Sequence, residues 1–176
     1  MRSFLVPLSM SAVVAVAACA PVVSGGPPIP VMPGLQQTAQ LGAVYMSSGW
    51  LSAEDDFQET FTDEVSQEMR RCLVGTALVD VRIHIDRLDR EGRLATFLNG
   101  GGEHRLSGTV EFVYPGRGNE VVGRFPVSVV VHDNGGLNGL VTDRQMVVSE
   151  AFGRAICEEG FGRNPRGPNV TNATAD

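Results

Sequence analysis

Residues 79–86 carry the side chains that come nearest to a catalytic set. The apolar residues of this segment alternate with Asp80, Arg82, His84 and Asp86, which places the four polar side chains on one face of a strand. A histidine and an aspartate of this kind can form a catalytic set with a serine. In such a set the serine is the nucleophile, the histidine is the base and the aspartate orients the histidine. Any solvated sheet face offers such combinations, and no G-x-S-x-G sequence accompanies this one. We therefore interpret the charges as cross-strand pairs with a neighbouring strand and assign no catalytic residue.

The three histidines do not predict a metal site. His84, His104 and His132 have neither the H-x3-H nor the HExxH spacing of metal ligands, so we expect each to be an exposed polar residue on or beside a strand. The glycines at 100–102 are not followed by G-K-[ST] and do not open a helix after a strand, which argues against a phosphate-binding loop. The sequence predicts no metal and no cofactor.

The first of three cysteines, Cys19, follows an apolar run that opens with Met1 and Arg2. One cation, an apolar core and then small residues is the layout of a secretory signal. The run is too short to span a bilayer, which takes about 20 predominantly apolar residues. We expect residues 1–18 to be removed during export.

The four residues that end this segment resemble the lipobox of bacterial lipoproteins: Val16, Ala17, Ala18 and Cys19. The resemblance implies that Cys19 becomes the first residue, linked to diacylglycerol and acylated with a fatty acid such as palmitate. Ala20, where an aspartate commonly retains lipoproteins at the inner membrane, implies an outer-membrane anchor facing the periplasm. The alternative is an ordinary signal cleavage that leaves Cys19 as a plain thiol.

The charge of the chain limits its partners. Loss of residues 1–18 removes Arg2 and no acid, which leaves 20 acidic and 13 basic residues in the mature protein. An acidic chain without a basic run has no electrostatic footprint for nucleic acid. It also has no polybasic patch for anionic lipid, so we expect the covalent anchor alone to hold it on the membrane.

Composition divides the rest of the chain into three parts. Residues 19–39 are rich in Pro and Gly and uncharged, which predicts an extended tether. Residues 40–162 suffice for a single domain with one core. Residues 163–176 have almost no large apolar side chain and predict a disordered tail.

Two helices are predicted from apolar residues that recur at helical spacing. The first begins at Ser52 as N-cap and ends at Gly75, and the second begins at Thr142 and ends at Gly160. Their apolar stripes are Phe57, Phe61, Val65, Met69 and Leu73, and Val148, Phe152, Ala155 and Ile156.

Four strands are predicted, at residues 41–46, 79–86, 105–114 and 121–131. In the last strand, Val121 shares the apolar face with the valines at 127, 129 and 131, and Pro126 favours an edge position. The order strand, helix, three strands, helix indicates an α+β fold. We expect a two-layer sandwich, with two helices on one face of a mainly antiparallel four-stranded sheet. Its polar face should be open to solvent or to a partner.

This element order on a lipid-anchored chain resembles small periplasmic lipoprotein domains, among them lipopolysaccharide-assembly lipoproteins and auxiliary lipoproteins of transport systems. The resemblance covers the architecture, so it carries over no functional residue. Our preferred hypothesis is a non-enzymatic protein that binds another envelope protein or a lipid in outer-membrane assembly, transport or integrity. The alternative is a small periplasmic hydrolase or ligand-binding protein that uses the polar face around His84.

Cys72 and Cys157 are the two cysteines that remain once Cys19 is lipidated. An even count in an oxidising compartment favours pairing. In the predicted topology both helices run in the same direction, and each cysteine lies in the last turn of its helix. We therefore predict a disulfide between them; the alternative is two buried, reduced thiols.

Overall fold

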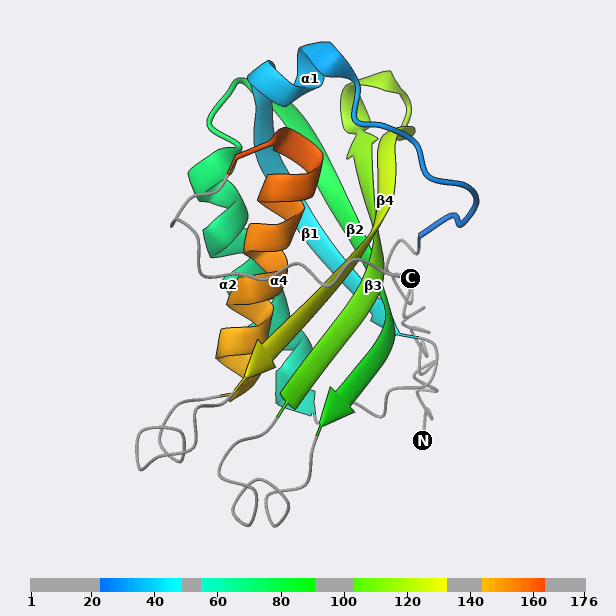
Figure 1. The fold of residues 1–176 in the computed structure, drawn as a ribbon. Coiled ribbons are helices and arrows are strands. Elements are labelled where there is room, and N and C mark those ends of the chain that lie inside the picture. The colour runs from blue at the N-terminus through cyan, green and yellow to red at the C-terminus, as the bar shows by residue number, and fades with distance from the viewer. Residues whose placement is uncertain (1–22, 49–54, 91–102, 133–143, 164–176) are drawn as a thin grey trace, which may run out of the picture.

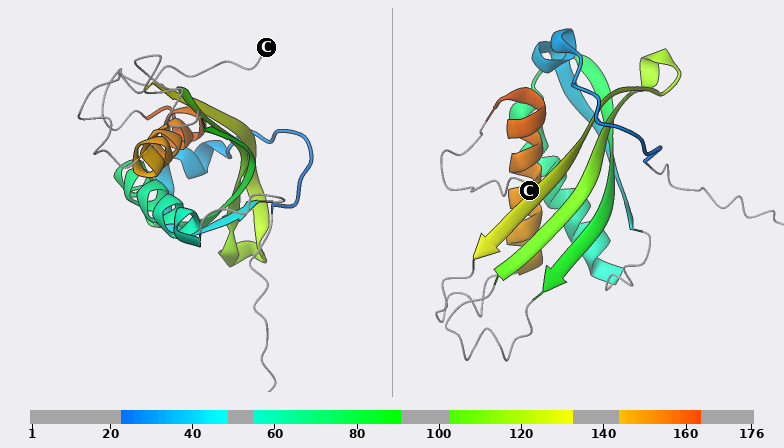
Figure 2. Two further views of the ribbon diagram at one scale, coloured as in Figure 1. Left: turned by 90° about the horizontal axis from the view of Figure 1, so that it is seen from below. Right: turned by 45° about the vertical axis from the view of Figure 1, so that its right-hand side comes forward.

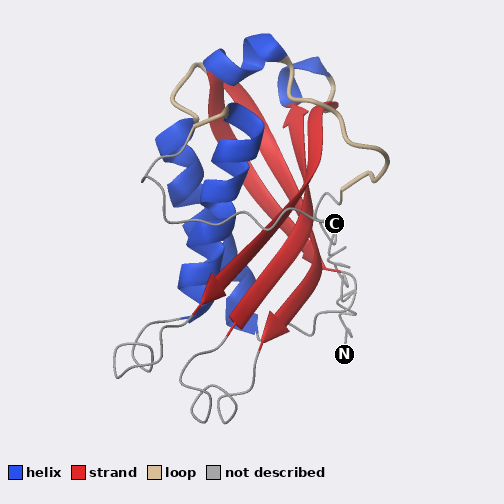
Figure 3. Cartoon of the chain, in the orientation of Figure 1, coloured by secondary structure: helices blue, strands red, loops and turns tan. Residues whose placement is uncertain are grey.

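A computed structural model describes residues 23–48, 55–90, 103–132 and 144–163 of the chain. They form the predicted two-layer α+β fold, in which a four-stranded sheet curves around two long helices (Figure 1, Figure 3). A short helix at the N-terminal side closes one end of the core (Figure 1). No helix among these residues is long and apolar enough to cross a bilayer.

The two long helices, α2 (Asp55–Cys72) and α4 (Arg144–Phe161), pack against each other and against one face of the sheet (Figure 2). This inner face and both predicted helical stripes supply the core, as expected. The starts assigned to Ser52 and Thr142 lie outside the described residues. The buried stripes are Phe57, Phe61, Val65, Met69 and Leu73, and Val148, Phe152, Ala155 and Ile156.

The sheet has the order β1-β2-β3-β4. Strand β1 (Ala39–Ser48) pairs with β2 (Ala77–Arg90) in parallel, because α2 forms the crossover between them. Strands β3 (Glu103–Tyr114) and β4 (Glu120–His132) continue the sheet in antiparallel fashion. The expected hairpin joins them through the short 3-10 helix Pro115–Arg117. Strand β4 is an edge strand, as Pro126 predicts.

A bulge changes the phase of β4 near its start. The register shifts between Phe112 and Val113, so that Phe112 pairs with Gly123 and Val113 pairs with Val121. As a result Val122 is buried, whereas Val121 is only half-buried. The simple alternation that places Val121 on the apolar face is therefore wrong at this end of the strand, because a bulge adds one residue to the count.

Helix α4 continues beyond the predicted end at Gly160. It ends at Phe161, and Gly162 follows in the left-handed conformation (φ +62°) that closes many helices. Phe161 is buried with its ring edge-on to that of Phe112, at a centroid distance of 5.1 Å. The predicted end was wrong because two glycines, Gly160 and Gly162, lie close together in the sequence. The first is part of the helix and the second follows its end.

The described part of the predicted tether, residues 23–39, packs against the domain instead of extending away from it. Ile29 forms an antiparallel bridge with Arg124, at the free edge of β4. Val31 and Leu35 are buried in the core, the latter on helix α1 (Pro33–Thr38). Figures 1 and 2 show this blue segment passing from the outside of the sheet, around the β4 edge, to the end of the core. Composition predicts extension here but does not show what the apolar residues contact.

Candidate functional site

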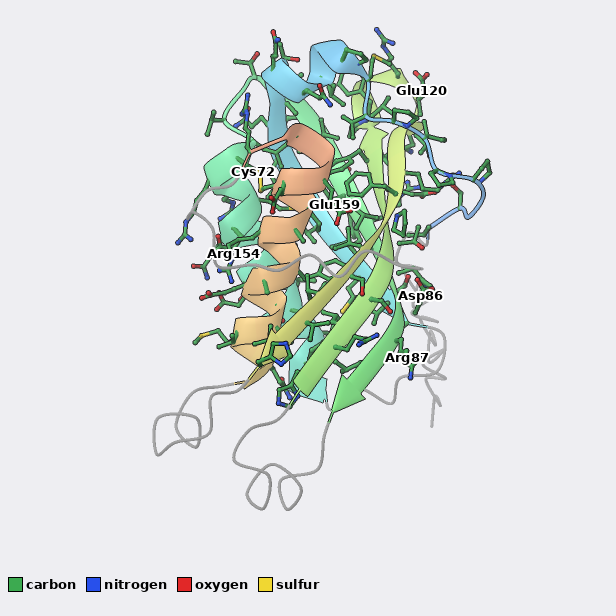
Figure 4. All side chains as sticks on the ribbon, viewed as in Figure 1. Cys72, Asp86, Arg87, Glu120, Arg154 and Glu159 are labelled. Carbon is green, nitrogen blue, oxygen red and sulfur yellow. A yellow bond between two sulfur atoms is a disulfide. The ribbon has the colours of Figure 1, made fainter. Side chains whose placement is uncertain are left out.

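The predicted polar side chains lie together on the outer face of the sheet, away from the helices. Arg82 pairs across the strands with Glu111, and His84 with Thr109, as the strand pattern suggests. A register shift between Ile85 and Arg87 follows, and Figure 4 shows Asp86 and Arg87 on this outer side. We call these residues the outer polar face: Asp80, Arg82, His84, Asp86, Arg87, Arg105, Ser107, Thr109, Glu111 and Arg124.

Among the described residues, His84 has one short polar contact. Its Nδ1 lies 3.0 Å from the Ser47 hydroxyl oxygen on β1, and that hydroxyl is also 3.4 Å from the Ile83 carbonyl. His84 Nε2 is 3.9 Å from the nearest Asp86 carboxylate oxygen, beyond hydrogen-bond range. The Thr109 hydroxyl donates to the other oxygen of Asp86 at 3.3 Å. A serine, a histidine and an aspartate are therefore adjacent, but the histidine and aspartate are not joined in this geometry.

Asp80 has a structural partner. Strand β1 bulges between Leu41 and Val44, and the Asp80 carboxylate accepts a hydrogen bond from the backbone N–H of Ala43 at 2.9 Å inside this bulge. The contact satisfies a donor that the irregular ladder leaves without a strand partner. Asp80 is therefore assigned to the fold of β1.

The most buried polar group of the outer face is the ion pair of Glu111 and Arg124. Glu111 is fully buried and Arg124 is 7% exposed, and their Oε1 and Nη2 atoms are 2.7 Å apart. Arg124 Nε also donates to Glu111 at 2.7 Å. Both residues occupy facing positions on β3 and β4. A buried charge of this kind requires a partner, and each supplies the other's.

The N-terminal segment lies over this ion pair and adds hydrogen bonds to both of its members. The backbone N–H and hydroxyl of Ser24 donate to the two Glu111 oxygens at 3.0 and 2.6 Å. Arg124 donates to the Ser24 hydroxyl oxygen at 2.9 Å and to the Pro27 carbonyl at 3.2 Å. Gly26, at φ +115°, passes so close to the Arg124 guanidinium that a Cβ would collide with it. We call residues 24–32 the strap.

Electrostatics favours an ionised Glu111. Burial acts to raise the pKa of the Glu111 carboxyl, but the hydrogen bonds from Ser24 and the charge and hydrogen bond of Arg124 outweigh it, so that its pKa lies below 4.5. At neutral pH the cluster is therefore a closed ion pair. It has a structural role, since the Arg124 guanidinium donates to Glu111 and to the strap residues Ser24 and Pro27.

The strap corrects the expectation of an outer face open along its whole length. At the Glu111 end the same chain covers the sheet, whereas Arg82 and His84 stay half-buried and Asp86 exposed. The histidines also differ from expectation, because His104 is buried at 7% exposure. The sequence held one signal of the ion pair beneath the strap. Glu111 and Arg124 each interrupt an apolar run, as the two members of a buried ion pair do.

The predicted disulfide is present. Cys72 and Cys157 are bonded, with their Cα atoms 5.9 Å apart, at the C-terminal ends of α2 and α4. The Arg163 guanidinium donates to the Cys72 carbonyl, where a cation suits the negative end of α2. Figure 4 shows Cys72 on the helical layer, well apart from Asp86 and Arg87. The bond therefore belongs to the helical layer and leaves the outer face unchanged.

Two of the sequence features discussed above lie outside the described residues. The lipobox with Cys19 and the glycines at 100–102 lie in segments that the structure does not describe. Within the described ranges, no group of three histidine, cysteine or acidic residues could hold a metal ion.

Comparison with known proteins gives no family. No protein-family model matches the chain, and no curated protein matches it. Similar solved structures include a dodecamer of a PelC variant from Paraburkholderia phytofirmans, with 8% identity and a TM-score of 0.45 over 78% of this chain and 95% of that one. A DUF330 protein from Xanthomonas campestris has 12% identity and a TM-score of 0.42, covering 76% and 87%. A minor lipoprotein from Acinetobacter baumannii has 13% identity and a TM-score of 0.32, covering 74% and 97%.

Proposed function

We propose that this protein is a lipid-anchored component of the bacterial envelope, with Cys19 as its acylated first residue. The observation that carries the proposal is the sequence Val16 to Cys19 at the end of a short apolar segment. The disulfide between Cys72 and Cys157 supports it, because such bonds form and persist in oxidising compartments such as the periplasm.

We further propose that the domain acts without catalysis, by binding another envelope component in the assembly, transport or integrity of the outer membrane. The outer polar face is the candidate binding surface, since the helices cover the other face of the sheet. Arg82 and His84 are half-buried there, and Asp86, Arg87 and Arg105 are exposed. These side chains offer hydrogen-bonding and charged groups on a broad sheet surface, which suits an interaction with another surface.

Mass spectrometry of the protein purified from its native host tests the anchor. We expect a mature chain that begins at Cys19 and carries diacylglycerol with an additional acyl chain. The variant Cys19→Ala should lose the lipid and leave the membrane fraction. A mature wild-type chain that starts at another residue, or that is soluble and unlipidated, would contradict the proposal.

A hydrolase is the second candidate, because Ser47 and His84 are in hydrogen-bond contact. The separation of 3.9 Å between His84 and Asp86 argues against it. A fluorophosphonate probe, which labels activated serines, distinguishes the two, with Ser107→Ala as a control on the same face. We expect no labelling of Ser47. Labelling that disappears in both Ser47→Ala and His84→Ala but persists in Ser107→Ala would establish the hydrolase instead.

A further inference from the structure

We propose that the outer polar face lies against the surface of the membrane that carries the lipid anchor, with the helices directed away from it. This inference rests on the proposed acylation of Cys19 and names the partner of the outer polar face. The partner is the headgroup layer of the same bilayer. Three features of the molecule favour this orientation: the place where the chain leaves the fold, the short connection to the anchor, and the distribution of charge.

The exit point of the chain is fixed on the outer polar face. Ser24 makes two hydrogen bonds to Glu111 and receives one from Arg124. Five residues later, Ile29 exchanges two backbone hydrogen bonds of 2.7 Å with Arg124. Because these bonds attach the strap to β3 and β4, the chain toward the N-terminus starts from the outer side of the sheet (Figures 1 and 2).

The connection between this exit point and the anchor is short. Cys19 precedes Ser24 by five residues. A fully extended chain spans at most about 3.6 Å per residue, so Cys19 cannot lie more than about 18 Å from Ser24. A diacylglycerol group fixes Cys19 at the headgroup layer. Ser24, and with it the Glu111 end of the outer polar face, must therefore stay within about 18 Å of that layer.

The helical layer cannot face the membrane under this restraint. Packed layers lie about 10 Å apart and a helix has a radius of about 5 Å, so the far side of α2 and α4 is about 15 Å from the centre of the sheet. Ser24 lies beyond the opposite surface of the sheet. To place the helices on the bilayer, the five residues would have to run around the sheet edge and past both layers, which exceeds their length.

The charge distribution favours the same orientation. Helices α2 and α4 contain nine acidic residues and four arginines, whereas the four strands contain six acidic residues and five arginines. The exposed Arg87 and Arg105 belong to the outer polar face. Bacterial membranes present lipid phosphates, which repel an acidic helical layer and attract arginines. The face that the short connection brings to the membrane is thus the less acidic one.

Fluorescence quenching on lipid vesicles tests the orientation. The native lipidated protein is inserted into vesicles of phosphatidylethanolamine and phosphatidylglycerol that contain a headgroup nitroxide lipid. A fluorophore is attached through one introduced cysteine: Ser107→Cys on the outer polar face, Gln67→Cys on α2, or Gln37→Cys on α1 at the end of the domain. We expect several-fold stronger quenching at position 107 than at positions 67 and 37.

Two controls separate this inference from the proposed function. Mass spectrometry of each preparation verifies the lipid on Cys19, so a missing anchor is detected independently of the orientation. A flexible Gly/Ser insertion of about 20 residues after Ala20 extends the connection to an average of about 25 Å, and should bring the quenching at the three positions close together. In a lipidated protein, equal quenching without the insertion, or strongest quenching at 67 or 37, would overturn the inference. Unchanged quenching in the extended variant would overturn the role given to the short connection.

Discussion

The two faces of the sheet are covered by different means. The inner face is covered by two long helices whose contacts are apolar, and the residues at its centre have no exposure to solvent. Among the described residues, the outer face is covered at one end only, by a strap held by a buried ion pair and hydrogen bonds. Burial of apolar side chains is nondirectional and stabilises the whole domain, whereas the ion pair at Glu111 and Arg124 fixes one segment at one place. Mutations on the two faces should therefore differ in how much they lower the free energy of unfolding. They should also differ in whether they weaken the whole domain or detach the strap alone.

Truncation on the inner face should have the largest effect. Phe112 is fully buried, with the Phe125 and Phe161 ring centroids 5.8 and 5.1 Å away. We expect Phe112→Ala to lower the free energy of unfolding by about 3–5 kcal/mol, because it removes a large apolar group and leaves a cavity. Urea denaturation followed by circular dichroism measures the change. Phe112→Leu should cost clearly less, and equal losses in the two variants would mean that packing at this site is not the cause.

The disulfide should contribute nearly as much to the helical layer. It closes a loop with a sequence separation of 85 residues. On the chain-entropy description, its removal in Cys72→Ala/Cys157→Ala should lower the free energy of unfolding by about 4 kcal/mol. The outer face should be unaffected. In hydrogen exchange, the free energy of opening of the strap, relative to that of global unfolding, should therefore be the same in this variant as in the wild type. Selective loss of protection in the strap would contradict the separation of the two regions.

Breaking the ion pair should have a smaller and more local effect. Glu111→Ala leaves Arg124 buried without its carboxylate, and we expect a loss of about 3 kcal/mol together with detachment of the strap. Limited proteolysis between residues 24 and 32 detects the detachment. The double variant Glu111→Met/Arg124→Leu removes both charges and should recover much of the stability, since two apolar groups replace the pair. A double variant as unstable as Glu111→Ala would show that the charge left unpaired is not the source of the loss.

Acid should loosen the strap without disturbing the inner face. Because the folded pKa of Glu111 is below 4.5, ionised Glu111 stabilises the fold above that pH, and this contribution is lost as the pH falls through the folded pKa. The difference in unfolding free energy between wild type and Glu111→Gln isolates this group from all others. We expect the difference to be constant from pH 7 to about 5 and to shrink below 4.5. A difference that grows on acidification would reverse the sign and contradict the assignment.

Most of the inner face could be predicted from the sequence, whereas little of the strap could. The stripe from Phe57 to Met69 and the alternation from Val79 to Ile85 each repeat with the period of their element, so the pattern identifies both the element and its buried side. The strap has no period. It consists of glycines, prolines and single apolar residues, whose contacts with Arg124 depend on a tertiary neighbour about a hundred residues away. Bulges, such as the one that pairs Val113 with Val121, were hidden for the same reason, since they are set by strand pairing.

The smallest effect is expected at the open end of the outer face. His84 is half-buried, its side chain is 32% exposed, and its short contact is with the Ser47 hydroxyl. Water can replace that contact, so we expect His84→Ala to change the free energy of unfolding by only about 0.5 kcal/mol. The same urea assay as for Phe112→Ala gives the comparison directly. A loss of several kcal/mol would mean that this end of the face is as firmly buried as the end beneath the strap, and the distinction between a covered and an open end would fail.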